Sequence, residues 1–553
     1  MEAIPGDDWR RTAVVYQIYP RSFADSNGDG IGDLPGITGR LDSLAELGVD
    51  AVWLSPFYTS PQADAGYDVA DYRDVDPIFG TIADFDALLA KAHSLGLKVI
   101  VDLVPNHSSD EHAWFKAALA AAPGSPERAR YIFRDGRGTN GELPPNNWES
   151  CFRGPAWTRT TNPDGTPGQW YLHLFDTKQP DWDWENPEVR AEFLSVLKFW
   201  LDRGADGFRV DVAHSLIKAP GLPDLDPRVD DGPEVDTEGA FMTGPMWDQD
   251  RVHEVYQSWR ALLDTYTPDR ILVAEAWVQP LSRLANYVRP DEMHQAFNFD
   301  YLETGWDAAE LRRTIDASMA ANQLVGAPTT WVLSNHDVVR HVSRLGLGTD
   351  GPRPNGIRAG DVQPDYQLGL RRARASSLLM LGLPGSAYLY QGEELGLPDH
   401  TSLDDDLRQD PTWWRSEYRE AGRDGCRVPL PWEAGAPGLG FGPSAKTWLP
   451  QPDSYAGLAR DQQTGVDGST LDMYQSALAL RRAFKLGAGS IEWAAGRGAD
   501  VIGYTNGEVT VITNMGAQPV PLPAGEVLMA SGELPADGTL PADVTAWLVS
   551  ADF

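Results

Sequence analysis

Short runs of consecutive apolar residues alternate with longer stretches of helical periodicity along most of the chain. Stretches such as LDSLAELGV, before residue 51, repeat apolar residues at helical spacing. Strands that alternate with helices indicate a parallel sheet with the helices outside it. About eight such units predict a closed (β/α)8 barrel. The predicted strands are 14–18, 51–54, 98–104, 207–212, 271–274, 296–299, 329–333 and 386–390.

Two segments depart from this alternation. Residues 106–179 are rich in Trp, Pro, Gly and Asn, and they predict an irregular, loop-rich domain inserted after the third strand. After about residue 475 the polarity alternates with period two, as in VIGYTNGEVTVITN, which predicts an antiparallel, sandwich-like β-domain over 476–553. The barrel then comprises 1–105 and 180–475. An open doubly wound sheet is the alternative, and it is disfavoured because no Gly-rich phosphate loop opens a helix.

Composition and charge exclude several classes of function. Of 553 residues, 42% are hydrophobic, which is enough for a large core. The chain has 46 basic and 80 acidic residues, a net charge of -34, so its surface repels phosphate backbones and anionic membranes. No run approaches 18 apolar residues, and the start MEAIPGDDWRR lacks the apolar core of a signal peptide. We expect a soluble cytoplasmic protein, either a monomer or a small homo-oligomer.

The chain has two cysteines, Cys151 and Cys426. Two cysteines exclude a disulfide framework and a zinc site built from cysteines. In a reducing compartment we expect both to be free thiols, and a disulfide between them is the alternative.

Polar residues gather where the predicted strands end, which is the functional rim of a (β/α)8 barrel. Burying several charges together is costly unless they have a function. A structural ion pair is the alternative for any one of them, but it explains four strand ends together poorly. These residues are Asp102, Asn106, His107, Arg209, Asp211, Glu275, His336 and Asp337.

Asp211 and Glu275 form the natural catalytic pair. Glycoside hydrolysis needs a nucleophile and an acid on either side of the scissile bond, and adjacent strand ends can hold them roughly 5–5.5 Å apart. Arg209 lies two residues from Asp211 on the same strand face, where it can keep that carboxyl group ionised. Glu275 lies among apolar neighbours, AEAW, a setting suited to an acid. Asp337 completes the set by binding sugar hydroxyl groups.

Eight sequence blocks then identify a family. The chain resembles the α-amylase superfamily, glycoside hydrolase family 13, in its α-glucosidase and oligo-1,6-glucosidase branch, over nearly its whole length. The resemblance implies that Asp211 is the nucleophile, Glu275 the general acid/base and Asp337 the transition-state stabiliser. The blocks are DSNGDGIGDL (25–34), ADAGYD (63–68), DLVPNH (102–107), QPDWDWENP (179–187), GFRVDV (207–212), EAW (275–277), SNHD (334–337) and QGEELG (391–396).

The same resemblance implies a pocket closed around one terminal glucose. Asp64 matches the aspartate that binds outer hydroxyl groups, and Arg427 matches the arginine that pairs with it. Tyr67 matches a ring that stacks on the sugar, although ordinary core packing is the alternative for each aromatic residue. A closed pocket implies exo attack, one glucose at a time. The remaining implied contacts are His107, Phe152, Phe175, Gln179, Arg209 and His336.

The first block also follows half of a calcium loop. Oxygen ligands stand at positions 1, 3, 5, 7 and 9, a glycine stands at position 6, and Gly36 replaces the glutamate expected at position 12. The matching loop of the family binds one structural calcium. We therefore expect a bound divalent ion, with Mg²⁺ as a competitor and a solvated acidic turn as the alternative. The predicted ligands are Asp25, Asn27, Asp29, Ile31 (through its carbonyl) and Asp33.

The sequence thus predicts a retaining, exo-acting α-glucosidase that needs no organic cofactor. Val212, directly after the nucleophile, often accompanies α-1,6 activity in the family. The segments GFRVDVAHSLIK and GRDGCRVPLPW nevertheless favour α-1,4. Glucosyl transfer and action on sucrose or trehalose are open alternatives. A non-catalytic partner of a membrane transporter is disfavoured because the three carboxylates are present and no anchor is seen.

Overall fold

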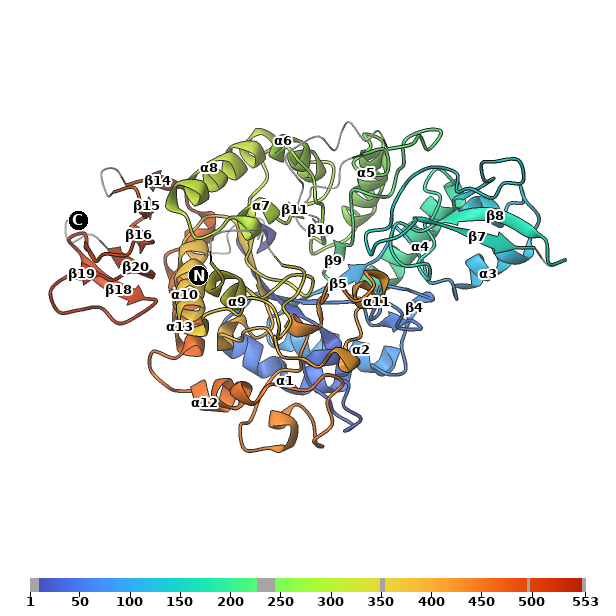
Figure 1. Ribbon diagram of the computed structural model, residues 1–553. Coiled ribbons are helices and arrows are strands. Elements are labelled where there is room, and N and C mark those ends of the chain that lie inside the picture. The colour runs from blue at the N-terminus through green and yellow to red at the C-terminus, as the bar shows by residue number, and fades with distance from the viewer. Residues whose placement is uncertain (1–8, 163, 226–243, 349–353, 495–497, 550–553) are drawn as a thin grey trace.

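The computed structural model describes residues 9–162, 164–225, 244–348, 354–494 and 498–549. Within them, eight parallel strands form one sheet in the order β11-β10-β9-β5-β2-β1-β13-β12. A parallel bridge between Phe297 and Thr330 joins the two ends, so the sheet closes into a barrel (Figure 1). The strands are β1 (Val14–Ile18), β2 (Ala51–Leu54), β5 (Lys98–Leu103), β9 (Gly207–Val210), β10 (Ile271–Ala274), β11 (Gln295–Ala296), β12 (Thr330–Val332) and β13 (Ser386–Tyr390).

Helices follow the strands and surround them (Figure 1). In α1, apolar residues at helical spacing are buried against the sheet, and Asp33 caps the N-terminus by accepting from the Gly36 N–H. In α2, Thr81 and Asp84 form a capping box. The outer helices are α1 (Leu34–Leu47), α2 (Ile82–Ser94), α4 (Pro187–Arg203), α5 (Val252–Leu263), the short α6 (Leu281–Leu284), α8 (Ala308–Val325), α10 (Tyr366–Leu381) and α13 (Thr470–Ala483).

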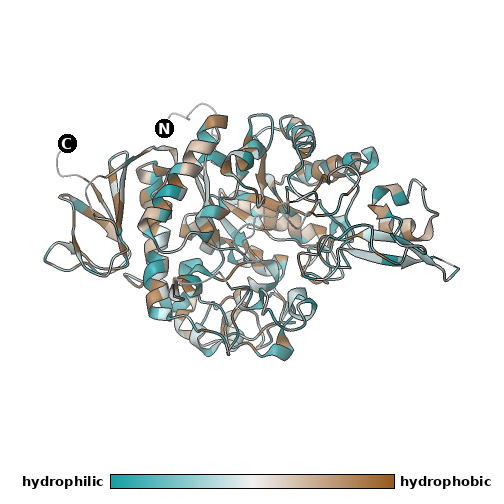
Figure 2. Cartoon of the chain, turned by 45° about the horizontal axis from the view of Figure 1, so that its top comes forward, coloured by the Kyte–Doolittle hydropathy of each residue, from teal (hydrophilic) through white to brown (hydrophobic). Residues whose placement is uncertain are grey.

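Alternate residues of most barrel strands enter two separate cores. Val15 and Val273 pack inside the barrel, whereas Tyr16 and Leu272 pack between the strands and the helices. The strands are buried on both faces, which explains why they are continuous apolar runs. Figure 2 shows apolar residues concentrated along the central strands, and apolar and polar residues alternating along the helices around them.

Four predicted strands have the observed bounds, and four end differently. The third and fourth end at Leu103 and Val210, and the seventh is one residue shorter at each end. Val212 has φ +42°, which is incompatible with a strand and strained for a β-branched residue. The sixth strand is Gln295–Ala296, because the Asn298 side chain accepts from the Tyr301 N–H and caps helix α7 (Phe299–Glu303).

The inserted segment is more regular than its composition indicates. It holds helix α3 (Ala113–Ala120) and an antiparallel sheet of β6 (Phe133–Arg134), β8 (Pro167–Leu172) and β7 (Trp157–Thr161). Its strands lie on the opposite side of the barrel from the C-terminal strands (Figure 1). A small hairpin of β3 (Tyr58–Thr59) and β4 (Asp71–Val75) precedes α2.

The C-terminal segment contains the antiparallel strands predicted from its period-two pattern. They form sheets in the orders β14-β15-β16-β20-β18 and β17-β19. The boundary predicted at residue 476 falls inside α13, which packs against α1 and α10 and so belongs to the barrel. The strands are β14 (Ile491–Trp493), β15 (Val501–Asn506), β16 (Val509–Asn514), β17 (Val520–Pro521), β18 (Glu526–Ala530), β19 (Thr539–Leu540) and β20 (Val544–Val549).

The described chain also contains several short helices, most of them of the 3-10 type. None of its helices is both long and apolar enough to cross a membrane. The additional short helices include α9 (His341–Gly346), α11 (Pro411–Arg415), α12 (Arg460–Gln463) and the 3-10 helices Ala285–Val288 and Glu393–Leu395.

Candidate active site

A cavity of about 210 Å³ opens where the barrel strands end. Eight of the residues predicted from the sequence line it, and four lie behind its wall. The lining residues are Asp64, Tyr67, His107, Phe152, Phe175, Asp211, Glu275 and Asp337. The four behind them, Gln179, Arg209, His336 and Arg427, each bond to a lining residue or its backbone.

Arg209 joins three carboxyl groups from three adjacent strands. On β9, Arg209 is in register with Asp102 of β5 and with Val273 of β10. Its side chain therefore lies close to the ends of both neighbouring strands. Nη1 lies 2.9 Å from Asp102 Oδ1 and 2.6 Å from Asp211 Oδ1. Nη2 lies 2.9 Å from Glu275 Oε2. The predicted contact between Arg209 and Asp211 is therefore present, and the same guanidinium group also holds Glu275.

The charges around Arg209 do not balance. Among the described residues, Arg209 is the only ion-pair partner of Asp102, Asp211 and Glu275. Burial raises the pKa of Asp211 well above its ordinary value, although Arg209 opposes this. Burial likewise raises the pKa of Asp102 to about 7. Burial therefore favours the protonated forms of Asp102 and Asp211, and the positive charge of Arg209 opposes this effect.

Glu275 is held by two further donors. Its Oε2 accepts from the Val212 N–H at 2.8 Å, and its Oε1 accepts from the Trp277 indole at 3.2 Å. The left-handed turn at Val212 directs that N–H toward Glu275, so the strained backbone conformation positions a hydrogen-bond donor for the carboxyl group. The Trp277 ring stacks on Phe299, with centroids 4.0 Å apart. These contacts fix the carboxyl group beside the cavity.

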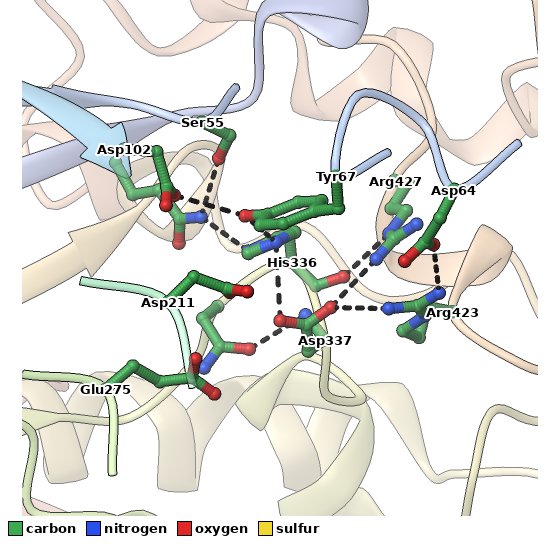
Figure 3. Close-up of polar contacts among 12 residues, drawn as sticks. Ser55, Asp64, Tyr67, Asp102, Asp211, Glu275, His336, Asp337, Arg423 and Arg427 are labelled. Atoms are coloured by element: carbon green, nitrogen blue, oxygen red, sulfur yellow. Dashed lines mark hydrogen bonds and ion pairs between the residues drawn. The ribbon is translucent and has the colours of Figure 1, made fainter. Parts of the chain in front are cut away.

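Asp337 faces Asp211 and Glu275 across the same space (Figure 3). Its Oδ1 lies 3.0 Å from Arg423 Nη1 and 2.8 Å from Arg427 Nη2. Burial opposes ionisation, but the neighbouring His336 and the two guanidinium groups hold the pKa of Asp337 well below its ordinary range. Because burial lowers the pKa of His336 and keeps its ring neutral, the two arginines supply the positive charge that stabilises the carboxylate, and His336 contributes only as a neutral neighbour.

A hydrogen-bond chain runs behind Asp337. The Gln17 amide lies 2.7 Å from Nδ1 of His336, and the Tyr67 hydroxyl group lies 2.6 Å from Nε2. Asp337 Oδ2 lies 3.3 Å from the same Nε2. An ionised carboxylate only accepts, so we assign the imidazole proton to Nε2. Tyr67 then donates to Asp102 at 3.2 Å, which links Asp337 to the Arg209 cluster (Figure 3).

One predicted pairing is wrong. The ion pair to Asp64 is made by Arg423, whose Nη2 lies 2.8 Å from Asp64 Oδ1, and not by Arg427. Arg423 also binds Asp337 and Asp410, and Arg427 binds Asp337 and the His336 carbonyl. Both arginines stand in one short segment, RDGCR, so no local pattern distinguishes them. The need of Asp64 and Asp410 for a cation becomes visible only with their burial in the structure, so the sequence offers no signal for Arg423.

Aromatic rings and neutral polar groups form another part of the wall and of the layer behind it. Phe152 and Phe175 meet edge to face at 5.7 Å, and Phe175 packs on His107 at 5.1 Å. Burial lowers the pKa of His107 to about 4, so its ring is neutral. Gln179 donates to Asp64 at 3.2 Å and lies 3.1 Å from His107 Nε2. Tyr67 stacks one face on His336, at 5.3 Å between centroids.

Cys151 and Cys426 both line the cavity. Both are free thiols in the structure. Burial raises the pKa of Cys151 to about 12 and also raises that of Cys426. The thiols are therefore protonated, and they act as small wall residues and not as nucleophiles.

The loop at residues 25–33 is a series of tight turns. Asp25 accepts three backbone N–H groups, including that of Gly30 at 2.9 Å. Asn27 and Asp29 each accept from the N–H two residues on. Asp33 is committed to capping α1 and to bonding Ser26. No group of three or more His, Cys, Asp or Glu side chains able to hold a metal occurs in the described ranges.

A closed barrel whose strand ends present paired carboxyl groups to a sugar-sized cavity defines the class of protein: a glycoside hydrolase. The model of the α-amylase catalytic domain matches residues 17–487. The chain therefore belongs to the α-amylase family, which confirms the resemblance seen in its sequence blocks.

Known relatives cover nearly the whole chain. A probable α-glucosidase of Rhizobium meliloti (strain 1021) is 40% identical over 90% of this chain and 86% of the relative. An oligo-1,6-glucosidase of Parageobacillus thermoglucosidasius is 38% identical over 86% of this chain and 84% of its own length. The solved structure of XgtA, an α-glucosyl transfer enzyme, matches with a TM-score of 0.83 and 37% identity, covering 98% of this chain and 99% of that one.

Proposed function

We propose that this protein is a retaining α-glucosidase that removes single glucose units from the non-reducing end of short α-glucosides. The observation that carries the proposal is the bridge through Arg209, which binds Asp211 and Glu275 at 2.6 and 2.9 Å. Asp211 Oδ1 and Glu275 Oε2 bind the two terminal nitrogens of the same guanidinium group. The distance between these two oxygens is therefore at most the two contact lengths plus the width of that group. Such a separation suits two carboxyl groups that act on one acetal.

In this proposal Asp211 attacks the anomeric carbon while Glu275 protonates the leaving oxygen. The glycosidic bond breaks and a β-glucosyl ester of Asp211 forms. Glu275, now a base, takes a proton from water, the water oxygen attacks the same carbon, and α-glucose leaves. The ionised Asp337 stabilises the positive charge that develops on the sugar ring.

Exo attack follows from the size and closure of the pocket. Its volume of about 210 Å³ lies below the roughly 300–1,000 Å³ of sites for drug-sized ligands, which favours one sugar ring. Asp64 and Arg423 close the end of the cavity and offer a carboxylate and a cation to outer hydroxyl groups. His107, Phe152, Phe175, Gln179, His336 and Arg427 complete the proposed glucose site.

The Asp211→Asn variant tests this proposal. It removes the nucleophile at nearly constant volume, so release of nitrophenol from p-nitrophenyl α-glucoside should fall to background while the fold is kept. Asp42→Asn, at a carboxyl group 57% exposed on α1, is the matched control. Activity retained by Asp211→Asn would refute the nucleophile assignment. An inactive wild-type protein would instead favour a non-catalytic role.

For the linkage we favour α-1,4, because the segments around the nucleophile and Arg427 match that group. Val212 lines the pocket and is the feature that favours α-1,6 instead. Initial rates on maltose, isomaltose, kojibiose, nigerose, trehalose and sucrose, with the products resolved, test this choice. A higher rate on isomaltose than on maltose would overturn it, and oligosaccharide products would identify glucosyl transfer.

We also propose that the loop at Asp25, Asn27, Asp29, Ile31 and Asp33 binds a divalent cation, Ca²⁺ before Mg²⁺. The fit is partial. The turns bring carboxylate, amide and carbonyl oxygens together. The Asp33 carboxylate, however, already accepts the Gly36 N–H as the cap of α1, so it is less available as a metal ligand than the sequence pattern implied. The cation would stabilise the loop without entering the reaction. Chelation should lower Tm and leave kcat unchanged, and an unchanged Tm would contradict the proposal.

The protein is, in this proposal, cytoplasmic and a monomer or small homo-oligomer. Two free thiols in the cavity wall are typical of a reducing compartment. Fractionation of source cells, together with the mass of the native protein in solution, tests both points.

A further inference from the structure

Three chain segments that are far apart in the sequence form the rim of the cavity. The inserted segment contributes Cys151 and Phe152, the loop after β12 contributes Pro354–Gly356, and the loop after β13 contributes Gly422 and Arg423. None of these segments belongs to the barrel strands, so their spacing depends on what holds them together.

Glu420 bonds to two of these segments from its place on the third. Its Oε1 accepts from Arg153 Nη2 at 2.7 Å and from Arg153 Nε at 2.9 Å. Its Oε2 accepts from Asn355 Nδ2 at 2.9 Å. Asn355 lines the cavity and Arg153 follows Phe152, which also lines it. Glu420 itself does not line the cavity, so it acts through its neighbours.

Further contacts join the inserted segment to the loop after β13. Arg415 Nη2 donates to the Arg153 carbonyl at 2.7 Å, and Arg415 Nη1 donates to Asp176 at 3.4 Å. The guanidinium group of Arg423 lies 5.2 Å from the Phe152 ring centroid. Arg153 has φ +79°, an unfavourable conformation that these contacts maintain. Glu420 is the carboxylate within this set that reaches all three segments.

We propose that Glu420 is a positioning residue that fixes the opening of the pocket and thereby restricts the enzyme to short glucosides. The inference rests on the proposed α-glucosidase function. Without Glu420 the inserted segment and the loop after β12 lose their shared anchor and the rim widens. The catalytic carboxyl groups are held separately by Arg209, so the chemical step is unaffected.

Glu420→Ala tests the inference by a split between binding and chemistry. One lost ion pair of a half-buried carboxylate, with its hydrogen bonds, should raise KM for maltose about threefold to tenfold. kcat on maltose should not change, and the ratio of kcat/KM for maltotetraose to that for maltose should rise. Glu420→Gln keeps the shape and one acceptor, so its values should lie between those of wild type and Glu420→Ala.

Glu417→Gln is the matched control, because Glu417 is on the same loop and its side chain is 85% exposed. It removes the same charge and should behave as wild type. Arg153→Asn suits the positive φ of that position. Because Arg153 and Glu420 form one ion pair, the double variant Arg153→Asn with Glu420→Ala should raise KM no further than the larger of the two single changes. High salt should raise KM in wild type but not in Glu420→Ala.

The outcomes separate the two proposals. If wild type does not hydrolyse p-nitrophenyl α-glucoside, the proposed function fails. If wild type is active and Glu420→Ala folds with an unchanged KM and an unchanged chain-length ratio, the inference about Glu420 is refuted. A fall in kcat with KM unchanged would also refute it, because it would place Glu420 in the chemistry and not in the rim.

Discussion

Replacing Arg423 with methionine tests how the closed end of the pocket is stabilised. The change removes the charge and keeps most of the side-chain volume. Arg423 is 13% exposed and binds Asp64, Asp337 and Asp410. Among the described residues it is the only ion-pair partner of Asp64, whereas Asp337 keeps Arg427 at 2.8 Å. The variant therefore leaves two buried aspartates, Asp64 and Asp410, without an ion-pair partner among the described residues.

Breaking such a buried pair costs about 3–5 kcal/mol of stability. The loss depends on pH with a definite sign. Burial already raises the pKa of Asp64 above its unfolded value, and removal of Arg423 raises it further. When the pKa of a carboxyl group is higher in the folded than in the unfolded protein, its burial costs least below the unfolded pKa. The free energy of unfolding then decreases as pH rises through the folded pKa. The variant should therefore be close to wild type in acid and much less stable at neutral pH.

Thermal unfolding at several pH values, with kinetics on p-nitrophenyl α-glucoside, measures both consequences. Because Asp64 and Asp337 lose their fixed positions, kcat/KM should fall roughly 10–100-fold. Arg419→Met is the control, since that side chain is 74% exposed on the same loop. If Arg423→Met melts at the wild-type temperature at neutral pH and keeps its kcat/KM, this account of the pocket is wrong.

The remaining predictions concern other buried groups. Burial raises the pKa of Glu393 to about 8, so stability should fall as pH rises from its unfolded pKa toward 8. Glu393→Gln should flatten that pH profile, and a profile identical to wild type would contradict the assignment. Lys218→Met leaves Asp181 buried without its partner at 2.9 Å and should cost about 3–5 kcal/mol in denaturant unfolding. A reducing agent should leave Tm unchanged because Cys151 and Cys426 are free, and a lower Tm would reveal a disulfide.

The sequence alone determined the barrel and the identity of its strand-end carboxyl groups. Strands buried on both faces must be continuous apolar runs, so their positions can be read locally, and the bounds of β1 and β10 were correct. Asp211 and Glu275 follow such runs directly. Their meeting then follows from the rule that parallel strands end at one rim.

Only the tertiary structure decided how the charges are paired. Asp64 and Arg423 are separated by 359 positions, and Arg427 stands four residues from Arg423 in the same segment. Which guanidinium group reaches Asp64 depends on how the two loops approach each other, and no periodicity along the chain encodes that approach. The joining of three rim segments through Glu420 has the same origin. Ion pairs between loops depend on distances in space, whereas strands and helices follow from neighbours in the chain.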